Sequence, residues 1–300
     1  MAAPEIPLQA GGPIAGEPIR EAEAIERLRQ TDDASQQYYG AWWLGRMRSR
    51  HPEAVPLLQA ALRQRQARDP GAGVEHNAVA RNAARALGKL GDTSAIPDLL
   101  ATLDDEDDGL REAAARALGE LRAVEAVPPL CARLASGPRG AGAPLPNSPR
   151  LQEPCEALIE ALGDIGSRTA AVLSVIEPFC DHERPLIRSA AARALLQLSG
   201  DSRWGELLLE LLCHPQLQVR RAALMDLGAV GWRPALEPIR ATLAENSLKL
   251  IALRGLAERP FASNQATCQP AAQQPIDPQL IDYPIDEALE AVLDVMDALL

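Results

Sequence analysis

Apolar residues recur along this chain in a pattern that repeats about every 30 residues. Residues 110–121 (LREAAARALGEL) combine leucines at helical spacing with a run of alanines, and similar stretches occupy 79–90 and 187–198. Such a stripe is typical of an amphipathic helix, and alanine lets a neighbouring helix approach closely. Self-similarity at this period predicts an all-α superhelix, a solenoid of stacked helix pairs. The matching leucines of the successive copies are Leu44, Leu87, Leu118, Leu162, Leu195, Leu227 and Leu256.

The chain divides into segments of different character. Residues 1–18 are rich in Ala, Pro and Gly, which predicts a flexible arm, and residues 19–258 contain the repeats. Residues 259–284 hold five prolines and lose the period, so we expect a linker there. Residues 285–300 predict an amphipathic helix whose apolar side needs cover, either from the end of the solenoid or from another protein. Its apolar positions are Ile285, Leu289, Val292, Met296 and Leu299.

Glycine-containing stretches separate the predicted helices. Gly91–Asp92, Gly163–Asp164 and Gly200–Asp201 predict boundaries at which one helix ends on glycine and the next begins with a capping residue. Insertions rich in Gly and Pro, at 64–76 and 136–149, predict irregular loops between repeats.

Composition and charge exclude several classes of protein. The formal net charge of −11 argues against general nucleic-acid binding, which needs a basic surface. The five cysteines are scattered without a CxxC pair, so we expect free thiols in a reducing cytoplasm rather than disulfides or a metal site. No apolar run approaches the ~20 residues needed to span a bilayer, and we expect no signal peptide.

No catalytic residue is predicted. Cys180, Asp181 and His182 are adjacent on a predicted turn and point apart, whereas a catalytic triad must converge, so we interpret them as a solvated loop. The acidic turn at 104–108 lacks the spaced ligands and the closing glutamate of a calcium-binding loop.

Four of the nine aromatic residues lie on fewer than two turns of one predicted helix, over residues 36–50. Two interpretations stay open. The rings would either plug the open end of the solenoid, or form a platform on which a flat conjugated molecule stacks while an arginine one turn later pairs its carboxylate. Both interpretations are compatible, with one face of the helix plugging the end of the solenoid and the other face binding the ligand. The residues are Tyr38, Tyr39, Trp42, Trp43 and Arg46.

Several blocks resemble the E-type subunits of the heterodimeric E/F phycobilin lyases. They are YYGAWWLGR at 38–46, RNAARALGKLGD at 81–92, MDLGAVG at 225–231 and ENSLKLIALR at 245–254. The resemblance runs from about residue 19 to 258, with a weaker echo in the last helix. HEAT-like repeats are shared by many scaffolds, whereas the aromatic block and ENSLKL are more specific. The family commonly has alanine where this chain has Gly40, which would leave more room beside the rings.

The resemblance implies a HEAT-like repeat solenoid that, with an F-type partner, attaches phycocyanobilin through a thioether bond to a cysteine of the phycocyanin alpha subunit during phycobilisome biogenesis. The bilin is then the substrate, the nucleophile belongs to the apo-phycocyanin acceptor, and we expect no cofactor. With a bilin as ligand, the aromatic group would supply stacking and Arg46 would pair a propionate. Asp226, on an inner helix in a mostly apolar setting, would hydrogen-bond bilin N–H groups or cap a neighbouring helix. The final helix would dock the partner.

Two other functions stay open. In the first, the chain attaches a different bilin, with or without isomerisation, to a phycoerythrin-type subunit. In the second, it is a non-catalytic scaffold for protein–protein interaction. Fold does not separate these functions, and the aromatic–arginine group is the discriminating feature because a scaffold has no need of exposed rings.

Overall fold

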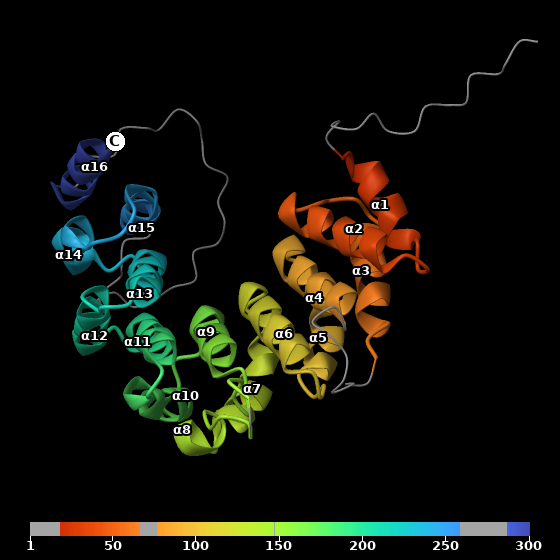
Figure 1. The fold of residues 1–300 in the computed structure, drawn as a ribbon, viewed down its shortest axis with the longest axis horizontal. Coiled ribbons are helices and arrows are strands. Elements are labelled where there is room, and N and C mark those ends of the chain that lie inside the picture. Colours follow the sequence, from red (N-terminus) through yellow and green to blue (C-terminus); the bar gives the residue numbers. More distant parts are fainter. Residues whose placement is uncertain (1–18, 67–76, 147, 259–286) are drawn as a thin grey trace, which may run out of the picture. The chain divides into compact units, whose positions relative to one another are not determined.

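The computed structural model describes residues 19–66, 77–146, 148–258 and 287–300. Over these ranges the regular elements are helices, and the only strand-like pairing is an isolated antiparallel bridge between Pro144 and Leu151. The described residues divide into two compact units, one before and one after the boundary between residues 92 and 93, and Figure 1 labels their helices. The predicted all-α fold is confirmed. The predicted arm at 1–18 and linker at 259–284 lie outside the described residues.

Within its described residues, the first unit contains the helices α1 (Glu21–Arg29), α2 (Ala34–Arg46), α3 (Ala54–Arg63) and α4 (Ala78–Leu90). Helix α2 packs against both α1 and α4, and α3 packs against α4. Asp33 begins α2 because its carboxylate accepts hydrogen bonds from the backbone N–H groups of Ser35 and Gln36. The helix ends earlier than the predicted end near residue 50.

Two glycines let α2 approach both of its neighbours. A Cβ atom at Gly40 would come within 2.7 Å of the Ala24 carbonyl oxygen in α1, and a Cβ atom at Gly45 within 2.8 Å of Ala86 in α4. Gly40 therefore serves the contact between α1 and α2. The prediction that it leaves room beside the aromatic rings is wrong.

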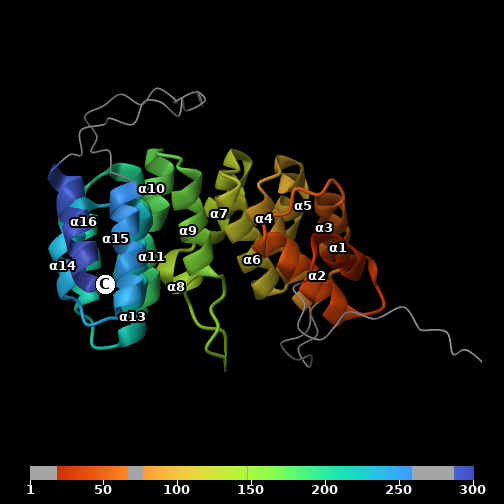
Figure 2. The ribbon, with the colours of Figure 1, turned by 90° about the horizontal axis from the view of Figure 1, so that it is seen from above.

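The described part of the second unit consists of two layers of helices that alternate along the chain. Figure 2 shows neighbouring helices of the inner layer lying side by side, in agreement with their contacts. The inner layer contains α6 (Asp108–Glu120), α9 (Cys155–Ile165), α11 (Pro185–Ser199), α13 (Leu217–Val230) and α15 (Asn246–Glu258). The outer layer contains α5 (Ile96–Thr102), α7 (Val127–Leu134), α10 (Ala170–Ile176), α12 (Ser202–Leu212) and α14 (Leu236–Ala241). Short elements join them, namely α8 (Gly137–Gly140), η1 (Thr93–Ala95), η2 (Val124–Ala126), η3 (Glu177–Asp181) and η4 (Arg233–Ala235).

Leucine and alanine form the cores of both units, as the repeat pattern predicts. Burying one leucine side chain stabilises a fold by about 1.5–3 kcal/mol relative to leaving it exposed. Alanines between the leucines keep the helices close, and those of α6 and α11 are all buried. The matching leucines of the repeats are all buried: Leu44, Leu87, Leu118, Leu162, Leu195, Leu227 and Leu256.

The predicted glycine boundaries are only partly correct. Gly91 and Gly200 end their helices in the left-handed conformation, with φ of 78° and 73°. Gly163 instead lies inside α9, where a Cβ atom would come within 3.1 Å of Ala194, and the helix ends at Gly166. The glycine at 163 is thus a site of close helix packing, and the stop signal lies three residues later.

Two loop predictions are also corrected. The insertion at 136–149 is not wholly irregular, because it contains α8. The segment with Cys180 and His182 is not solvated throughout, because both of these side chains are buried. The His182 ring stacks on Phe179, and its Nε2 lies 3.1 Å from the carbonyl oxygen of Gly142. These contacts explain the histidine as part of the core.

The last described helix, α16 (Glu287–Leu299), packs against α15. Val292 is buried, and Leu289, Met296 and Leu299 are half-buried. Asn246 at the start of α15 donates a side-chain N–H to the carbonyl oxygen of Leu299 at 3.1 Å. The chain therefore covers part of this apolar side itself. Ile285 lies outside the described residues, and the docking of a partner on this helix stays a prediction.

Candidate functional site

The aromatic group on α2 lies at the surface of the first unit. Tyr38, Tyr39 and Trp42 are 39%, 54% and 47% exposed, and Trp43 is half-buried. Gln37, Leu44 and three small residues occupy the buried side of the helix instead. The rings of Tyr38 and Tyr39 meet edge to face, with their centroids 6.0 Å apart. At least three rings are thus accessible to a ligand.

The rings do not plug the end of the solenoid, because α1 covers the other side of α2. Ile25 and Leu28 of α1 are buried, and Gln37 of α2 donates its side-chain N–H to the Leu28 carbonyl oxygen at 3.2 Å. The end-plug interpretation is therefore wrong. The ligand-platform interpretation stays a prediction, which the exposure of the rings supports.

A hollow of about 480 Å³ opens between the beginnings of α2 and α4. Tyr38 and Tyr39 line it from α2, while Arg81 and Arg85 line it from α4. Small-molecule sites typically have volumes of ~300–1,000 Å³. Aromatic rings and guanidinium groups in one hollow suit a flat ligand that carries negative charge.

Two contacts hold α4 beside α2. Asn82 donates its side-chain N–H to the carbonyl oxygen of Tyr38 at 3.0 Å, and the close approach of Gly45 to Ala86 brings the two backbones together further along. Trp42, Trp43 and Arg46 do not line the hollow and lie further along α2. The rings at its wall therefore face arginines of α4 rather than the predicted Arg46.

Arg81 and Arg85 are both absent from the site residues predicted from sequence. The available signal is their spacing of four residues on the helix of the next repeat. That signal becomes informative only when α2 and α4 are known to be neighbours. On sequence alone, an arginine on an amphipathic helix is most simply interpreted as part of a solvated face.

Asp226 is buried in the second unit, and its surroundings are charged and polar rather than mostly apolar. The Ser189 hydroxyl donates to its carboxylate at 2.5 Å, and the Arg193 guanidinium lies 3.6 Å away. Burial raises the pKa of this carboxyl group, and the neighbouring arginine opposes that effect. Asp226 does not line the hollow of the first unit, and it contacts a network rather than capping a helix. A role toward bilin N–H groups stays a prediction.

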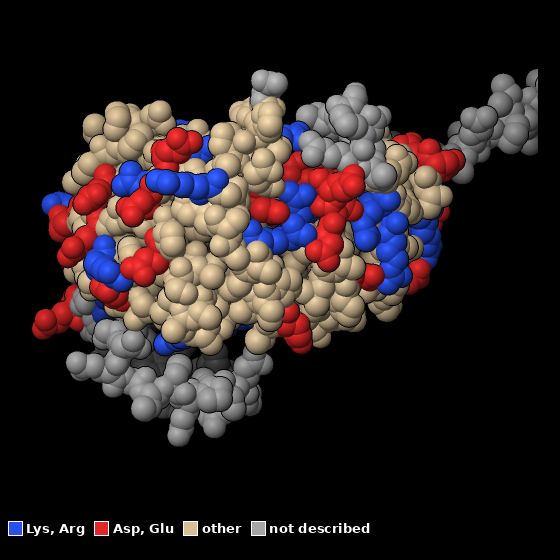
Figure 3. All heavy atoms as spheres, turned by 90° about the horizontal axis from the view of Figure 1, so that it is seen from below, with Lys and Arg blue, Asp and Glu red and all other residues tan. Residues whose placement is uncertain are grey.

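Two arginines of the inner layer each contact several carboxylates. Burial raises the pKa of Glu160 to about 7, even though a guanidinium group lies beside it. Figure 3 shows basic and acidic side chains next to one another over the face that it draws, which is the usual arrangement of paired surface charges. The inner-layer contacts are those of Arg116 with Glu112, Glu156 and Glu160, and those of Arg193 with Asp164 and Asp226.

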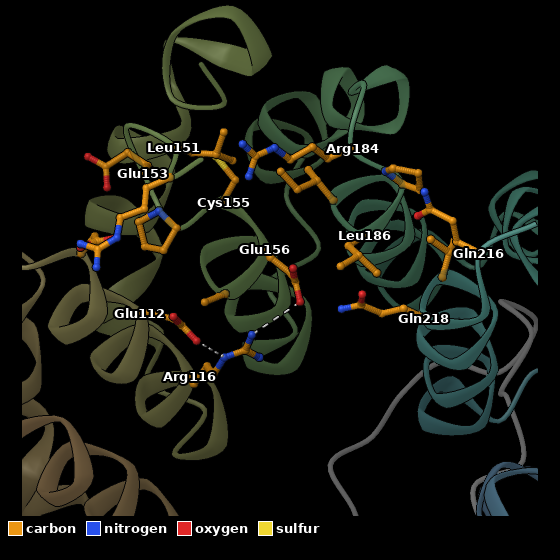
Figure 4. Close-up of a pocket in the computed structure, with 17 residues that line it drawn as sticks. Glu112, Arg116, Leu151, Glu153, Cys155, Glu156, Arg184, Leu186, Gln216 and Gln218 are labelled. Atoms are coloured by element: carbon orange, nitrogen blue, oxygen red, sulfur yellow. Dashed lines mark hydrogen bonds and ion pairs between the residues drawn. The ribbon is translucent and has the colours of Figure 1, made fainter. Parts of the chain in front are cut away.

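A second cavity, of about 440 Å³, lies where α9, α11 and α13 begin (Figure 4). Arg116 with Glu112 and Glu156 lies on one side, and Gln218 of α13 lies across from them. Cys155 also lines this cavity, and burial raises the pKa of its thiol to about 12. A thiol with that pKa is protonated at neutral pH and is a poor nucleophile.

Within the described residues, no three His, Cys, Asp or Glu side chains lie together in a way that would hold a metal ion. Over the same ranges, every helix is too short or too polar to cross a bilayer. The described cysteines are free thiols, namely Cys131, Cys155, Cys180 and Cys213.

Two family models match parts of the chain. The model described as HEAT repeats matches residues 72–141, and the model described as PBS lyase HEAT-like repeat matches residues 36–64 and 219–245. The aromatic helix α2 and the helix that carries Asp226 therefore both lie largely within segments of the second kind.

Relatives match the chain over most of its length. It is 55% identical to the bilin biosynthesis protein RpcE of Synechococcus sp. WH8020, over 81% of this chain and 91% of that protein. It is 45% identical to the phycocyanobilin lyase subunit alpha of Synechocystis sp. PCC 6803, over 84% of this chain and 92% of that protein. The same subunit of Synechococcus elongatus PCC 7942 is 44% identical, over 97% of this chain and 99% of that protein. Among solved structures, the complex of CpcE and CpcF of phycocyanin lyase from Nostoc sp. PCC7120 matches with a TM-score of 0.79 and 37% identity, over 98% of this chain and all of the matched chain.

Proposed function

The chain belongs to the family of phycocyanobilin lyase alpha subunits, and we propose that it attaches phycocyanobilin to a cysteine of the phycocyanin alpha subunit together with an F-type partner. The observation that carries this proposal is the match to lyase alpha subunits over nearly the whole chain. The match to a chain solved in a two-protein lyase complex supports the partner. The exposed rings beside arginines supply a surface that a pure scaffold does not need.

The attachment reaction is an addition. The sulfur of the acceptor cysteine forms a bond to one carbon of the exocyclic double bond of the bilin, and a proton is delivered to the other carbon. The thiol supplies both sulfur and proton, so no oxidant, reductant or leaving group is involved. The bilin is the substrate, and we propose that the reaction uses no cofactor.

The task of the lyase in this reaction is to hold and orient the bilin. Positioning two reactants in a productive geometry lowers a barrier by several kcal/mol, up to about 7–11 kcal/mol in the best intramolecular cases. We assign stacking of the bilin to the exposed rings of α2. The buried Cys155 thiol, with its raised pKa, does not compete with the acceptor cysteine for the electrophilic bilin.

The free thiols of the described residues suit a reducing compartment, and we propose that the protein works in the cytoplasm.

A second candidate function is the attachment of another bilin. The relative with 55% identity is named a bilin biosynthesis protein, without a specified bilin. A lyase or lyase-isomerase for a phycoerythrin-type subunit would use the same addition chemistry. The two candidates differ in the double-bond system of the attached bilin, which its absorbance spectrum reports.

Co-expression tests this function. The chain, an F-type partner, apo-phycocyanin alpha subunit and a phycocyanobilin-producing pathway are combined in one host, and each protein is omitted in turn. We expect a covalent adduct with the absorbance of phycocyanobilin when both lyase subunits are present, and little adduct when either is missing. A parallel host that makes phycoerythrobilin tests the second candidate.

Efficient and correctly coloured attachment by this chain without a partner would contradict the heterodimeric function. The absence of adduct with every bilin and partner would return the chain to the scaffold interpretation.

A further inference from the structure

Helices α2 and α4 carry an unusual charge distribution for this chain. Together they contain four basic residues and neither aspartate nor glutamate, whereas the whole chain has a net charge of −11. Nearby carboxylates normally compete with a ligand carboxylate for a guanidinium group. None of that competition comes from the two helices that form the hollow. The four residues are Arg46, Arg81, Arg85 and Lys89.

The basic residues of α4 lie along one side of the helix. Arg81, Arg85 and Lys89 are spaced four residues apart, so they follow one another turn by turn. The first two line the hollow opposite Tyr38 and Tyr39. A ligand that lies against the tyrosine rings therefore has cationic groups along its edge.

Arg85 is exposed, and no hydrogen bond or ion pair joins it to any described residue. Some exposed arginines of the second unit are instead engaged by carboxylates. Arg221 pairs with Glu245, and Arg254 pairs with Glu258 at 2.6 Å. The Arg85 guanidinium, with its planar set of donors, is thus available for bidentate binding of a carboxylate.

We propose that Arg85, together with Arg81, forms a carboxylate-binding site that recognises the propionate side chains of the bilin while its conjugated system lies against Tyr38 and Tyr39. This inference rests on the proposed function, because the bilin is its ligand. It goes further in assigning the recognition of the propionates to α4, and in making the ligand class a flat conjugated dicarboxylate. A bilin whose propionates are esterified keeps its rings but loses the charges that this site binds.

Binding titrations with phycocyanobilin and with its dimethyl ester test the inference. They are performed on the chain in complex with its F-type partner, by bilin absorbance. The variants are Arg85→Gln and Arg85→Lys, and the control is Arg168→Gln, which removes an exposed arginine of the second unit. Circular dichroism melting checks that each variant is folded.

We expect the unaltered complex to bind the free acid roughly five- to tenfold more tightly than the ester, as a charge-assisted pair at a half-open site allows. Arg85→Gln should weaken binding of the free acid to the level of the ester and leave binding of the ester unchanged. Arg85→Lys should restore part of the preference because it keeps the charge, and Arg168→Gln should behave as the unaltered complex.

Equal binding of acid and ester by the unaltered complex would overturn this inference and leave the proposed function standing. Binding of neither molecule would overturn both. Loss of acceptor-protein binding in Arg85→Gln, with bilin affinity unchanged, would assign the residue to docking of an acidic protein surface and would also overturn the inference.

Discussion

At the scale of single residues, two arginines in the inner layer of the second unit are each shared by several carboxylates. Arg116 contacts three carboxylates and Arg193 contacts two. Burial favours the neutral form of a carboxyl group, and it raises the pKa of Glu156, Glu160 and Asp226. Glu160 is the clearest case, since its pKa lies at about 7 and its side chain is only 15% exposed.

Glu160 makes the stability of the fold depend on pH. Between its ordinary pKa of 4.5 and its folded pKa of about 7, the folded chain holds a proton that the unfolded chain releases. The stabilising contribution of this carboxyl group to the free energy of unfolding is therefore fully present below pH 4.5 and is lost as the pH rises through about 7. At 1.36 kcal/mol per pKa unit, the loss is on the order of 3 kcal/mol.

Urea unfolding at pH 5, 6, 7 and 8 measures this contribution. In Glu160→Gln, the fall in the free energy of unfolding over that range should be smaller than in the unaltered chain by roughly 2–3 kcal/mol. The control is Glu206→Gln, which changes an exposed glutamate of α12 and should leave the pH dependence unchanged. Identical pH profiles for Glu160→Gln and the unaltered chain would show that the buried carboxyl group titrates normally.

Residue-scale chemistry was the hardest part to predict from the sequence. Asp226 was correctly placed on an inner helix, but its partners Ser189 and Arg193 come from the preceding repeat, and sequence distance hides them. The sequence places His182 on a predicted turn between helices, which favours a solvated side chain, whereas the structure packs it against Phe179 and Gly142. Residues that are distant in sequence form part of the surroundings of both side chains, and local composition does not predict which residues these are.

At the scale of elements, close packing of neighbouring helices depends on glycine. A Cβ atom at Gly255 of α15 would lie 2.1 Å from the backbone oxygen of Gly228 in α13. Backbone atoms do not rotate out of the way as a side chain would. An alanine at this position therefore requires α13 and α15 to separate.

Gly255→Ala should destabilise the second unit. The cost of overpacking is about 1–3 kcal/mol, and the higher helix propensity of alanine offsets up to about 1 kcal/mol of it. Thermal unfolding followed by circular dichroism should show a lower melting temperature. Arg254→Ala, at the adjacent exposed position on the same helix, removes only an exposed ion pair and should change the melting temperature little. A melting temperature for Gly255→Ala at or above that of the unaltered chain would contradict the packing.

The last helix has an apolar side that is only partly covered by its own chain. Val292 is buried and α16 contacts α15, while Leu293 on the same helix is 41% exposed. These observations agree with a helix that packs on its own solenoid and also presents apolar surface to a partner.

Removal of residues 285–300 should lower the melting temperature, because it uncovers the surface of α15 that α16 contacts. We also expect it to abolish co-purification with an F-type partner. Affinity pull-down and thermal unfolding of the same preparation separate the two effects. If the truncated chain still forms the complex but melts at a lower temperature, α16 packs only on its own chain and does not dock the partner.

At the scale of the whole molecule, the repeat period was sufficient to predict the fold. Alanine-rich stripes one repeat apart identify helices that have no stable form alone, so stacking follows from the need to bury each stripe. The matching leucines are buried in every repeat. Helix boundaries were less predictable, because Gly163 and Gly166 both resemble stop signals and only the fit against Ala194 decides between them.

The candidate site was predictable only in part for a similar reason. Aromatic side chains gathered on α2 are visible in the sequence, and their exposure follows from the small residues and the leucine on the opposite side. The hollow depends on which side of α4 faces α2, and that orientation is a matter of packing between the two helices, of which the hydrogen bond from Asn82 to Tyr38 is one part. Sequence spacing within one helix pointed to Arg46, whereas packing between two helices brings Arg81 and Arg85 to the rings.

The central claim is that the surface of α2 binds the bilin, and a paired measurement on two tryptophans tests it most directly. Trp42 is 47% exposed on α2, whereas Trp204 is buried in the second unit. Bilin absorbance titration and thermal unfolding are recorded for Trp42→Ala and for Trp204→Ala. Loss of a stacking ring weakens binding by on the order of 1–1.5 kcal/mol, and truncation of a buried tryptophan costs about 3–5 kcal/mol of stability. We predict that Trp42→Ala binds bilin roughly tenfold more weakly with an almost unchanged melting temperature, and that Trp204→Ala loses stability. Unchanged bilin affinity in Trp42→Ala, or a loss of stability that matches that of Trp204→Ala, would contradict the claim.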